Sequence, residues 1–321
     1  MTWLSEPGMV VAIIEIVLGL LLLTRAADAF IEGSVGVAHA LRLSPVLVGA
    51  VIVGFGTSAP ELLVSSAAAL DGNRDLGVGN IIGSNVANLS LVLASAAFVV
   101  PLIVSRSVLS REAPLSLLAV LAFAWCTVGG LTRWEGLGLL AGLVVALSWM
   151  ILGGHEGGES HVLDDQPRSM RYDGARTGVG LLGTVAGAQL LVWGSNGIAV
   201  AAGLTGGFIG FTLVAVGTSL PEMVTAVVAA RKRETELILG NLLGSNMFNS
   251  LAVGGVVALI SPGPITDPGL RTVGVTVMVI VATGAWVAMV TLRRVHRYEA
   301  AALLTGWLVS VWLLASRSGS T

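Results

Sequence analysis

The sequence has 321 residues, of which 55% are hydrophobic and only 11% charged, and its mean hydropathy is +0.89. A soluble domain has about 25% charged residues, so this chain cannot cover a water-facing surface. Its apolar stretches are each about 20 residues long, which predicts an all-α integral membrane protein. The net charge of −2 indicates no class of partner, and the single cysteine, Cys126, excludes an intramolecular disulfide.

In chain order, the hydropathy pattern predicts ten transmembrane helices. The N-terminus lacks a basic region, so the first segment is predicted to be a retained helix and not a cleaved signal. A polar stretch at 154–176 separates a first five-helix repeat at 1–153 from a second at 177–321. The predicted limits of the helices are 9–31, 44–70, 76–104, 113–130, 134–153, 177–202, 206–230, 236–260, 270–292 and 298–315.

The two halves carry the same polar signature. The first reads Gly-Thr-Ser-Ala-Pro-Glu at 56–61 and Gly-Asn-Ile-Ile-Gly-Ser-Asn-Val-Ala-Asn at 79–88. The second reads Gly-Thr-Ser-Leu-Pro-Glu at 217–222 and Gly-Asn-Leu-Leu-Gly-Ser-Asn-Met-Phe-Asn at 240–249. The offset is constant, since 222 − 61 = 161 and 249 − 88 = 161, which indicates one duplicated unit.

An odd number of helices in each half requires the second half to enter the membrane with the opposite orientation, which makes an inverted repeat. The charges in the connecting segments support this count. Twelve basic residues follow the odd-numbered helices and four lie on the other side, so the first side is predicted to be cytoplasmic and both termini extracytoplasmic. The twelve are Arg42, Arg106, Arg111, Arg168, Arg171, Arg176, Arg231, Lys232, Arg233, Arg293, Arg294 and Arg297.

The signatures place carboxylates inside the membrane. Glu61 and Glu222 fall near the middle of the second and seventh helices, where a charged side chain costs about 2.5–3.5 kcal/mol on insertion scales. Each follows a proline, which removes a backbone N–H and clashes with the preceding turn. Both helices are therefore predicted to break there and to free carbonyl groups that can point at a cation.

Hydroxyl and amide groups accompany each break, so the available ligand set consists of oxygen atoms. Hard cations prefer such ligands: Ca²⁺ takes about 6–8 oxygens in flexible geometry, whereas Mg²⁺ demands a tighter octahedron. Soft metals are disfavoured, because neither signature contains Cys or His. Two carboxylates match one Ca²⁺ or a few Na⁺, and a site that either ion can neutralise is a physical basis for exchange. The candidate side chains are Thr57, Ser58, Ser84 and Asn88, with Thr218, Ser219, Ser245 and Asn249.

Both signatures resemble the α-repeats of the cation/Ca²⁺ exchanger superfamily, in particular its prokaryotic sodium/calcium exchangers. The resemblance implies the ten-helix sodium/calcium exchanger fold, and a Ca²⁺ site of Glu61 and Glu222 with the carbonyls of Thr57 and Thr218. It implies an inner Na⁺ position at Gly54, Ser58, Glu61 and Ser84, and an outer one at Ala215, Ser219, Glu222 and Ser245. A central position is completed by Asn88 and Asn249. It also implies three Na⁺ exchanged for one Ca²⁺, with the first and sixth helices sliding past a fixed core.

The sequence departs from many of these relatives at Asn249, where prokaryotic and K⁺-dependent members have aspartate. One titratable group is thereby missing from the centre, which argues against K⁺ co-transport. We therefore predict a Na⁺/Ca²⁺ antiporter of the inner membrane, whose partners are Ca²⁺, Na⁺ and the lipid bilayer. No cofactor, enzymatic step, nucleic acid or obligate protein partner is predicted.

Several alternatives remain open on the sequence alone. A Ca²⁺ (or other cation)/H⁺ antiporter on the same fold would let the glutamates alternate between metal and proton. The glutamates could instead be protonated structural groups, and the threonines and serines could only satisfy backbone groups at the kinks. Asparagine also joins membrane helices by hydrogen bonds, which is the role predicted for Asn85 and Asn246. Glycines at small-xxx-small spacing, Gly79 with Gly83 and Gly240 with Gly244, predict close helix packing.

Overall fold

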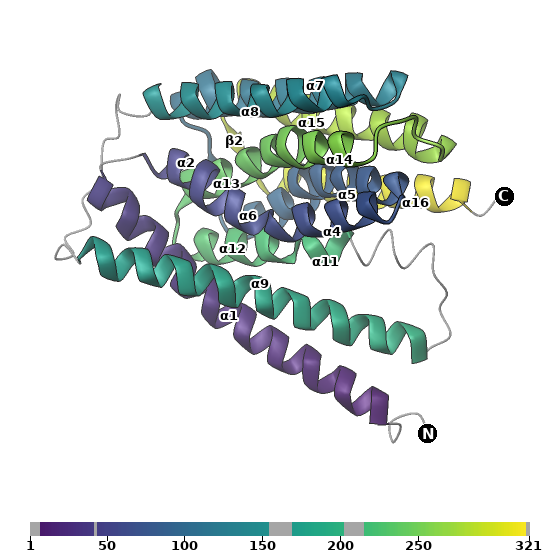
Figure 1. The fold of residues 1–321 in the computed structure, drawn as a ribbon. Coiled ribbons are helices and arrows are strands. Elements are labelled where there is room, and N and C mark those ends of the chain that lie inside the picture. The colour runs from purple at the N-terminus through teal and green to yellow at the C-terminus, as the bar shows by residue number, and fades with distance from the viewer. Residues whose placement is uncertain (1–6, 42–43, 154–168, 202–214, 319–321) are drawn as a thin grey trace.

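The computed structural model describes residues 7–41, 44–153, 169–201 and 215–318 (Figure 1). Each of the ten predicted segments coincides with helical structure in these ranges. Six described helices are long and apolar enough to cross a membrane, or seven if one bent pair counts as a single span. The protein is thus an all-α membrane protein.

The first half begins with one long helix and then alternates α-helical and π-helical turns. The first helix, α1, was expected to end at residue 31, but it continues to Leu41 because Val37 and Ala38 are buried. The elements are α1 (Pro7–Leu41), α2 (Pro45–Val48), η2 (Gly49–Val53), α3 (Gly54–Thr57), α4 (Ala59–Leu70), α5 (Arg74–Ala87), η3 (Asn88–Val92), α6 (Leu93–Val99), β1 (Leu102–Ile103), η4 (Val108–Glu112), α7 (Ala113–Gly129) and α8 (Arg133–Gly153).

The second half repeats this order. Its first helix, α9, begins at Met170, earlier than the predicted residue 177, and the Ser169 hydroxyl caps it by accepting from the Tyr172 N–H at 3.3 Å. Most of the predicted 154–176 linker lies outside the described residues. The elements are α9 (Met170–Ala201), α11 (Ala215–Thr218), α12 (Leu220–Arg231), α13 (Thr235–Phe248), η6 (Asn249–Val253), α14 (Gly254–Ile260), η7 (Leu270–Gly274), α15 (Val275–Leu292), β2 (Arg294–Val295) and α16 (Arg297–Ser318).

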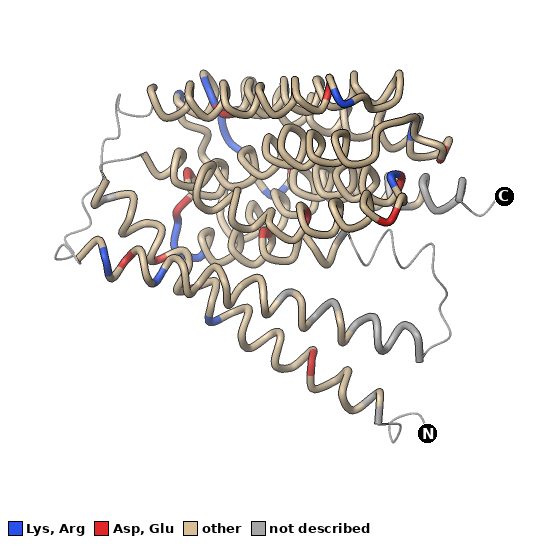
Figure 2. Tube along the Cα trace, in the orientation of Figure 1, with Lys and Arg blue, Asp and Glu red and all other residues tan. Residues whose placement is uncertain are grey.

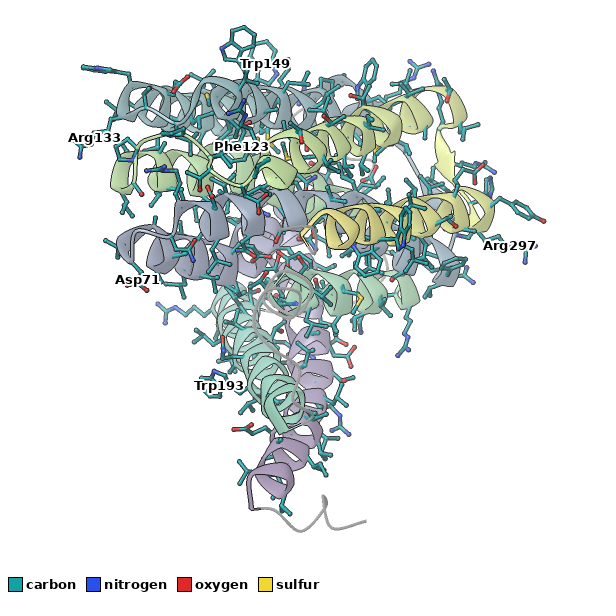
Figure 3. The ribbon with its side chains drawn as sticks, turned by 90° about the vertical axis from the view of Figure 1, so that its right-hand side faces the viewer. Asp71, Phe123, Arg133, Trp149, Trp193 and Arg297 are labelled. Atoms are coloured by element: carbon teal, nitrogen blue, oxygen red, sulfur yellow. The ribbon has the colours of Figure 1, made fainter. Side chains whose placement is uncertain are left out.

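The helices α1 and α9 lie side by side and extend away from the other helices (Figures 1 and 3). Glycines let their backbones approach closely: a Cβ on Gly180 would lie 2.6 Å from the Phe30 Cα, and one on Gly187 would lie 2.6 Å from the Leu23 N. Such small residues are the usual means of tight helix packing in membranes. The α1–α9 pair is therefore joined along its length.

The outer surface is apolar, as a lipid-facing surface must be. Large apolar side chains along α1 and α8 are exposed, for example Leu21 at 60% and Leu152 at 82%. Trp149 and Trp193 point outward in Figure 3, whereas Phe123 is buried in the body. Charged residues lie mostly toward the helix ends (Figure 2). This distribution matches a multi-pass membrane protein.

Contacts between connecting segments divide the helix ends into two groups. On one side, β1 pairs with β2 in antiparallel register, Leu102 with Val295. On the other, Leu131 and Gly263 exchange backbone hydrogen bonds of 2.9 and 2.7 Å. The pairings correspond approximately under the repeat, since 263 − 102 = 161 and 295 − 131 = 164. Each repeat is thus fastened to the other on both sides.

Contacts of charged side chains support this division of the helix ends into two groups. Arg74, at the start of α5, donates to the carbonyls of Ser261, Pro262 and Pro264 at 2.5–2.6 Å. At the opposite helix ends, Lys232 lies 2.8 Å from the Glu32 carboxylate, which also pairs with Arg176. The ends after the first, fifth and seventh predicted helices therefore meet, as an inverted repeat requires.

Candidate functional site

The two predicted helix breaks are present. Helix α3 ends at Thr57 and α4 begins at Ala59, with Ser58 between them at φ −83° and ψ 6°. The break in the second half is the same, with Ser219 at φ −86° and ψ 5° before α12. The axes of the first pair differ by 42°. The prolines at the second position of α4 and α12 account for both breaks, because neither can donate a backbone hydrogen bond.

The breaks place one glutamate at the start of each following half-helix. Glu61 and Glu222 lie in the first turns of α4 and α12, and both side chains are fully buried. A helix N-terminus carries a partial positive charge, which stabilises a carboxylate there. That charge is partial, so two buried carboxylates still need a cation or a proton nearby.

Hydrogen bonds at the carboxylates cross between the repeats. Ser58 donates to Glu222 Oε1 at 3.1 Å, and Ser219 donates to Glu61 Oε1 at 3.4 Å. Ser84 also donates to Glu61 Oε1, at 3.3 Å. The side chains of each half-site therefore come from both halves of the chain.

This pairing differs from the grouping that the resemblance implies. The resemblance places Ser58 with Glu61 and Ser219 with Glu222, but the hydroxyls contact the opposite glutamates. The Gly54 carbonyl likewise accepts from Ser245, at 3.1 Å. The reason is the inversion, which sets the break of one repeat against the glutamate of the other. Ala215 opens α11 at the position equivalent to Gly54, since 215 − 54 = 161, and its side chain is outside the described set.

The asparagines Asn88 and Asn249 begin the π-helical turns η3 and η6. A π-turn shifts the register of the helix by one residue, and such turns are frequent at functional sites. Both side chains are fully buried. Asn88 Nδ2 donates to Asn246 Oδ1 at 3.1 Å, whereas neither amide atom of Asn249 has a hydrogen-bond partner.

Five unpartnered polar atoms belong to these four residues. They are Glu61 Oε2, Glu222 Oε2, Asn88 Oδ1, and Oδ1 and Nδ2 of Asn249. A buried polar atom without a partner costs about 1–3 kcal/mol, and more when it is charged. Four of the five are oxygens, which is the ligand type that Na⁺ and Ca²⁺ take in proteins. The arrangement is therefore suited to a hard cation.

Asn85 and Asn246 have the structural role predicted for them. Asn85 Nδ2 donates to the Ser250 hydroxyl at 2.9 Å, and Asn246 Nδ2 donates to the backbone carbonyl of Asn85 at 3.2 Å. The Asn85 Oδ1 has no hydrogen-bond partner among the described residues. The two hydrogen bonds join the third and eighth predicted helices, which carry the site asparagines. Buried amide pairs of this kind hold membrane helices in register.

No role was predicted for Asn80 and Asn241, yet both amides make several hydrogen bonds near the site. Asn80 contacts Thr218, Ser65 and the Glu61 carbonyl, and Asn241 contacts Thr57, Thr225 and Ser245. A signal existed: on both α5 and α13, polar residues recur at i, i+4 and i+8, so they share one helix face. The stripes are Asn80, Ser84 and Asn88, and Asn241, Ser245 and Asn249.

Comparison with known proteins identifies relatives of the whole chain. Residues 11–152 and 175–315 both match the family model described as "Sodium/calcium exchanger protein". "Putative antiporter CaxA" of Alkalimonas amylolytica is 37% identical over 96% of this chain and all of its own length. "Inner membrane protein YrbG" of Escherichia coli is 34% identical over 85% of this chain and 87% of its own. A structure of the sodium-calcium exchanger NCX_Mj, soaked with Na⁺ and Sr²⁺, has a TM-score of 0.84 and 29% identity, covering 94% of this chain and 98% of that one.

Proposed function

The chain belongs to the sodium/calcium exchanger protein family, and we propose that it exchanges Na⁺ for Ca²⁺ across the cytoplasmic membrane as a secondary active antiporter. The observation that carries this proposal is the pair of fully buried glutamates, each with one oxygen held by a serine of the other repeat and one oxygen unpartnered. One divalent ion between them neutralises both charges. Two monovalent ions do the same separately, so the two ions compete for one set of ligands.

The contacts support a specific assignment of ligands. Ca²⁺ would lie between Glu61 and Glu222, with the carbonyls of Thr57 and Thr218, while Asn88 and Asn249 would complete the centre. Ser58 and Ser219 each donate to the glutamate of the other repeat. We therefore group the Na⁺ ligands by the contacts in the structure and not by the repeat that each residue belongs to. One position would use Glu222 with Ser58, Ser245 and the Gly54 carbonyl, and the other Glu61 with Ser84 and Ser219. The Ala215 carbonyl is added to the second position by its equivalence to Gly54 in the repeat.

The membrane arrangement is part of the proposal. The basic residues that follow the odd-numbered helices favour a cytoplasmic location for Lys232 and Arg176, and extracytoplasmic termini. We also propose the domain division at 1–153, 154–176 and 177–321, which the two regions matched by the family model, 11–152 and 175–315, support. In this orientation alternating access opens the glutamates to one side at a time.

The deciding experiment is Ca²⁺ uptake into proteoliposomes preloaded with Na⁺, with K⁺, Li⁺ and choline as controls and pH clamped on both sides. We expect uptake only with internal Na⁺, because outward Na⁺ movement supplies the driving force. Uptake that ignores Na⁺ but follows an imposed pH gradient would replace this proposal with Ca²⁺/H⁺ antiport on the same fold.

Asn249→Asp tests the charge of the centre. The variant places a third carboxylate beside Glu61 and Glu222 in a fully buried position, where burial and like charges favour proton binding. We expect its Na⁺-driven Ca²⁺ uptake to fall more steeply than that of the parent as pH is lowered over about pH 8 to 5. Identical pH profiles for the two proteins would exclude Asn249 from the centre of the site.

A further inference from the structure

We propose that Asn80 and Asn241 are positioning residues that brace the two broken helices against each other and so set the distance between Glu61 and Glu222. The inference rests on the proposed cation site and adds residues that bind no ion themselves. Both side chains are buried, with 4% and 2% of their surface exposed. They lie on α5 and α13, one turn before Ser84 and Ser245.

The first brace runs from the break of the first repeat to the glutamate-bearing half-helix of the second. The Thr57 hydroxyl donates to Asn241 Oδ1 at 3.3 Å, shared with the Val53 carbonyl at 3.0 Å. Asn241 Nδ2 donates to the Thr225 hydroxyl at 3.4 Å. Thr225 in turn donates to the Pro221 carbonyl at 2.7 Å. The Thr225 hydroxyl also lies 3.0 Å from the Glu222 carbonyl, so the chain of hydrogen bonds ends at the backbone of the glutamate.

The second brace has the same form in the opposite direction. The Thr218 hydroxyl donates to Asn80 Oδ1 at 3.2 Å. Asn80 Nδ2 donates to the Ser65 hydroxyl at 3.0 Å and reaches the Glu61 carbonyl at 3.5 Å. Each asparagine therefore accepts from the break of one repeat and donates toward the glutamate of the other. The asparagines and the threonines at the breaks are related by the 161-residue offset, since 241 − 80 = 161 and 218 − 57 = 161, whereas the hydroxyl partners Ser65 and Thr225 are 160 residues apart. The repetition of the first contact in both halves makes coincidence a poor explanation.

Hydrogen bonding distinguishes these asparagines from the proposed ligands. Asn88 and Asn249 each have an unpartnered amide oxygen that is available to a cation, as does Asn85. Asn80 and Asn241 have both amide groups engaged with protein. The direction of each amide follows from its neighbours, because Thr225 already donates to a carbonyl and can only accept from Asn241. Their effect on ions is therefore exerted through Thr57, Thr218 and the glutamates.

The brace predicts an effect on selectivity as well as on stability. A Ca²⁺ ion needs both carboxylates at one fixed separation, whereas each Na⁺ uses one carboxylate. Loosening the braces should therefore weaken Ca²⁺ binding more than Na⁺ binding. A loss of general stability would not change the ratio of the two affinities.

The test is a double-mutant cycle on the purified full-length protein, using Asn241→Ala and Thr57→Val. Valine keeps the shape and the backbone carbonyl of Thr57 and removes only the hydroxyl. We expect each variant to weaken Ca²⁺ binding about tenfold with a much smaller change for Na⁺, and the double variant to be no weaker than the single ones.

Asn85→Ala is the matched control, because Asn85 is equally buried on α5 but bonds to Ser250, outside the brace. It should lower the unfolding temperature and leave the Ca²⁺ to Na⁺ affinity ratio unchanged. Additive losses, or an unchanged ratio in Asn241→Ala, would overturn the brace.

The cycle is repeated on thermal unfolding in ion-free buffer, which makes the result independent of the transported ion. If the parent binds no Ca²⁺, the proposed function is wrong. The brace is then still tested, because energetic coupling between Thr57 and Asn241 in the unfolding temperatures would support it. Independent effects of the two substitutions there would contradict it.

Discussion

Glu61→Gln and Glu222→Gln are each expected to abolish Ca²⁺ uptake while leaving the protein folded. Glutamine keeps the size of the side chain and an oxygen that can accept from Ser84 or Ser58, but it removes one negative charge from a fully buried site. Losing one partner of a buried charge interaction costs about 2–5 kcal/mol, so Ca²⁺ affinity should fall about a hundredfold or more. Radioactive Ca²⁺ uptake and equilibrium binding both measure this loss.

The same variants should lose Ca²⁺ binding without losing stability in ion-free buffer. In ion-free buffer the parent holds two buried carboxylates whose second oxygens have no partner. Removing one charge relieves that cost, so both variants should unfold at a temperature equal to or above that of the ion-free parent. Added Ca²⁺ should then raise the unfolding temperature of the parent and not of the variants.

Glu112→Gln is the control, because Glu112 is also buried, with 6% exposed, but lies in η4 outside the site. It should transport Ca²⁺ at the parental rate. Normal uptake by Glu61→Gln or Glu222→Gln, in protein shown to be folded, would end the assignment of the site.

Gly244→Ala is expected to damage the fold more than any surface substitution. A Cβ on Gly244 would lie 2.5 Å from the Ala50 Cα and 2.8 Å from its carbonyl carbon, so the backbone of η2 would have to move. Overpacking of this kind costs about 1–3 kcal/mol, and backbone contacts leave little room for relief. Because Ser245 follows directly, transport should fall together with stability. Thermal unfolding and size-exclusion profiles in detergent measure the first effect.

Gly284→Ala is the matched comparison, since Gly284 is also in a helix and nothing lies within 4 Å of the added Cβ. Alanine is a better helix former than glycine by about 0.5–1 kcal/mol, so this variant should be unchanged or slightly more stable. Equal stability of the two variants would mean that α13 and η2 are not in close contact.

Much of the fold follows from the sequence, because hydropathy and proline act locally. The ten segments are read from apolar length, and the breaks at Ser58 and Ser219 follow from prolines that cannot donate a hydrogen bond. The close approach at Gly240 and Gly244 also follows from their spacing, and both glycines meet the backbone of α2 or η2. These features depend on the residue and its neighbours in the chain.

The pairing of the site residues does not follow in the same way. Ser58 and Glu222 are 164 residues apart, and Ser219 and Glu61 are 158 apart, so their contacts depend on how the two repeats interpenetrate. The resemblance groups each serine with the glutamate of its own repeat, whereas in the structure each serine donates to the glutamate of the other repeat. The braces at Asn80 and Asn241 were missed because an asparagine in a repeated motif looks the same whether it binds an ion or a neighbour. The hydrogen-bond partners of Asn80 and Asn241 are visible only in the structure.

The crossing of the serines has a consequence for the origin of the protein. Neither repeat alone completes the surroundings of its own glutamate, because Ser58 serves Glu222 and Ser219 serves Glu61. An ancestral gene that encoded one repeat could have formed this site only as a pair of identical chains inserted in opposite directions. Gene fusion would then have fixed the two orientations in one polypeptide. It also allowed the copies to diverge, as Gly54 and Ala215 have done at equivalent positions.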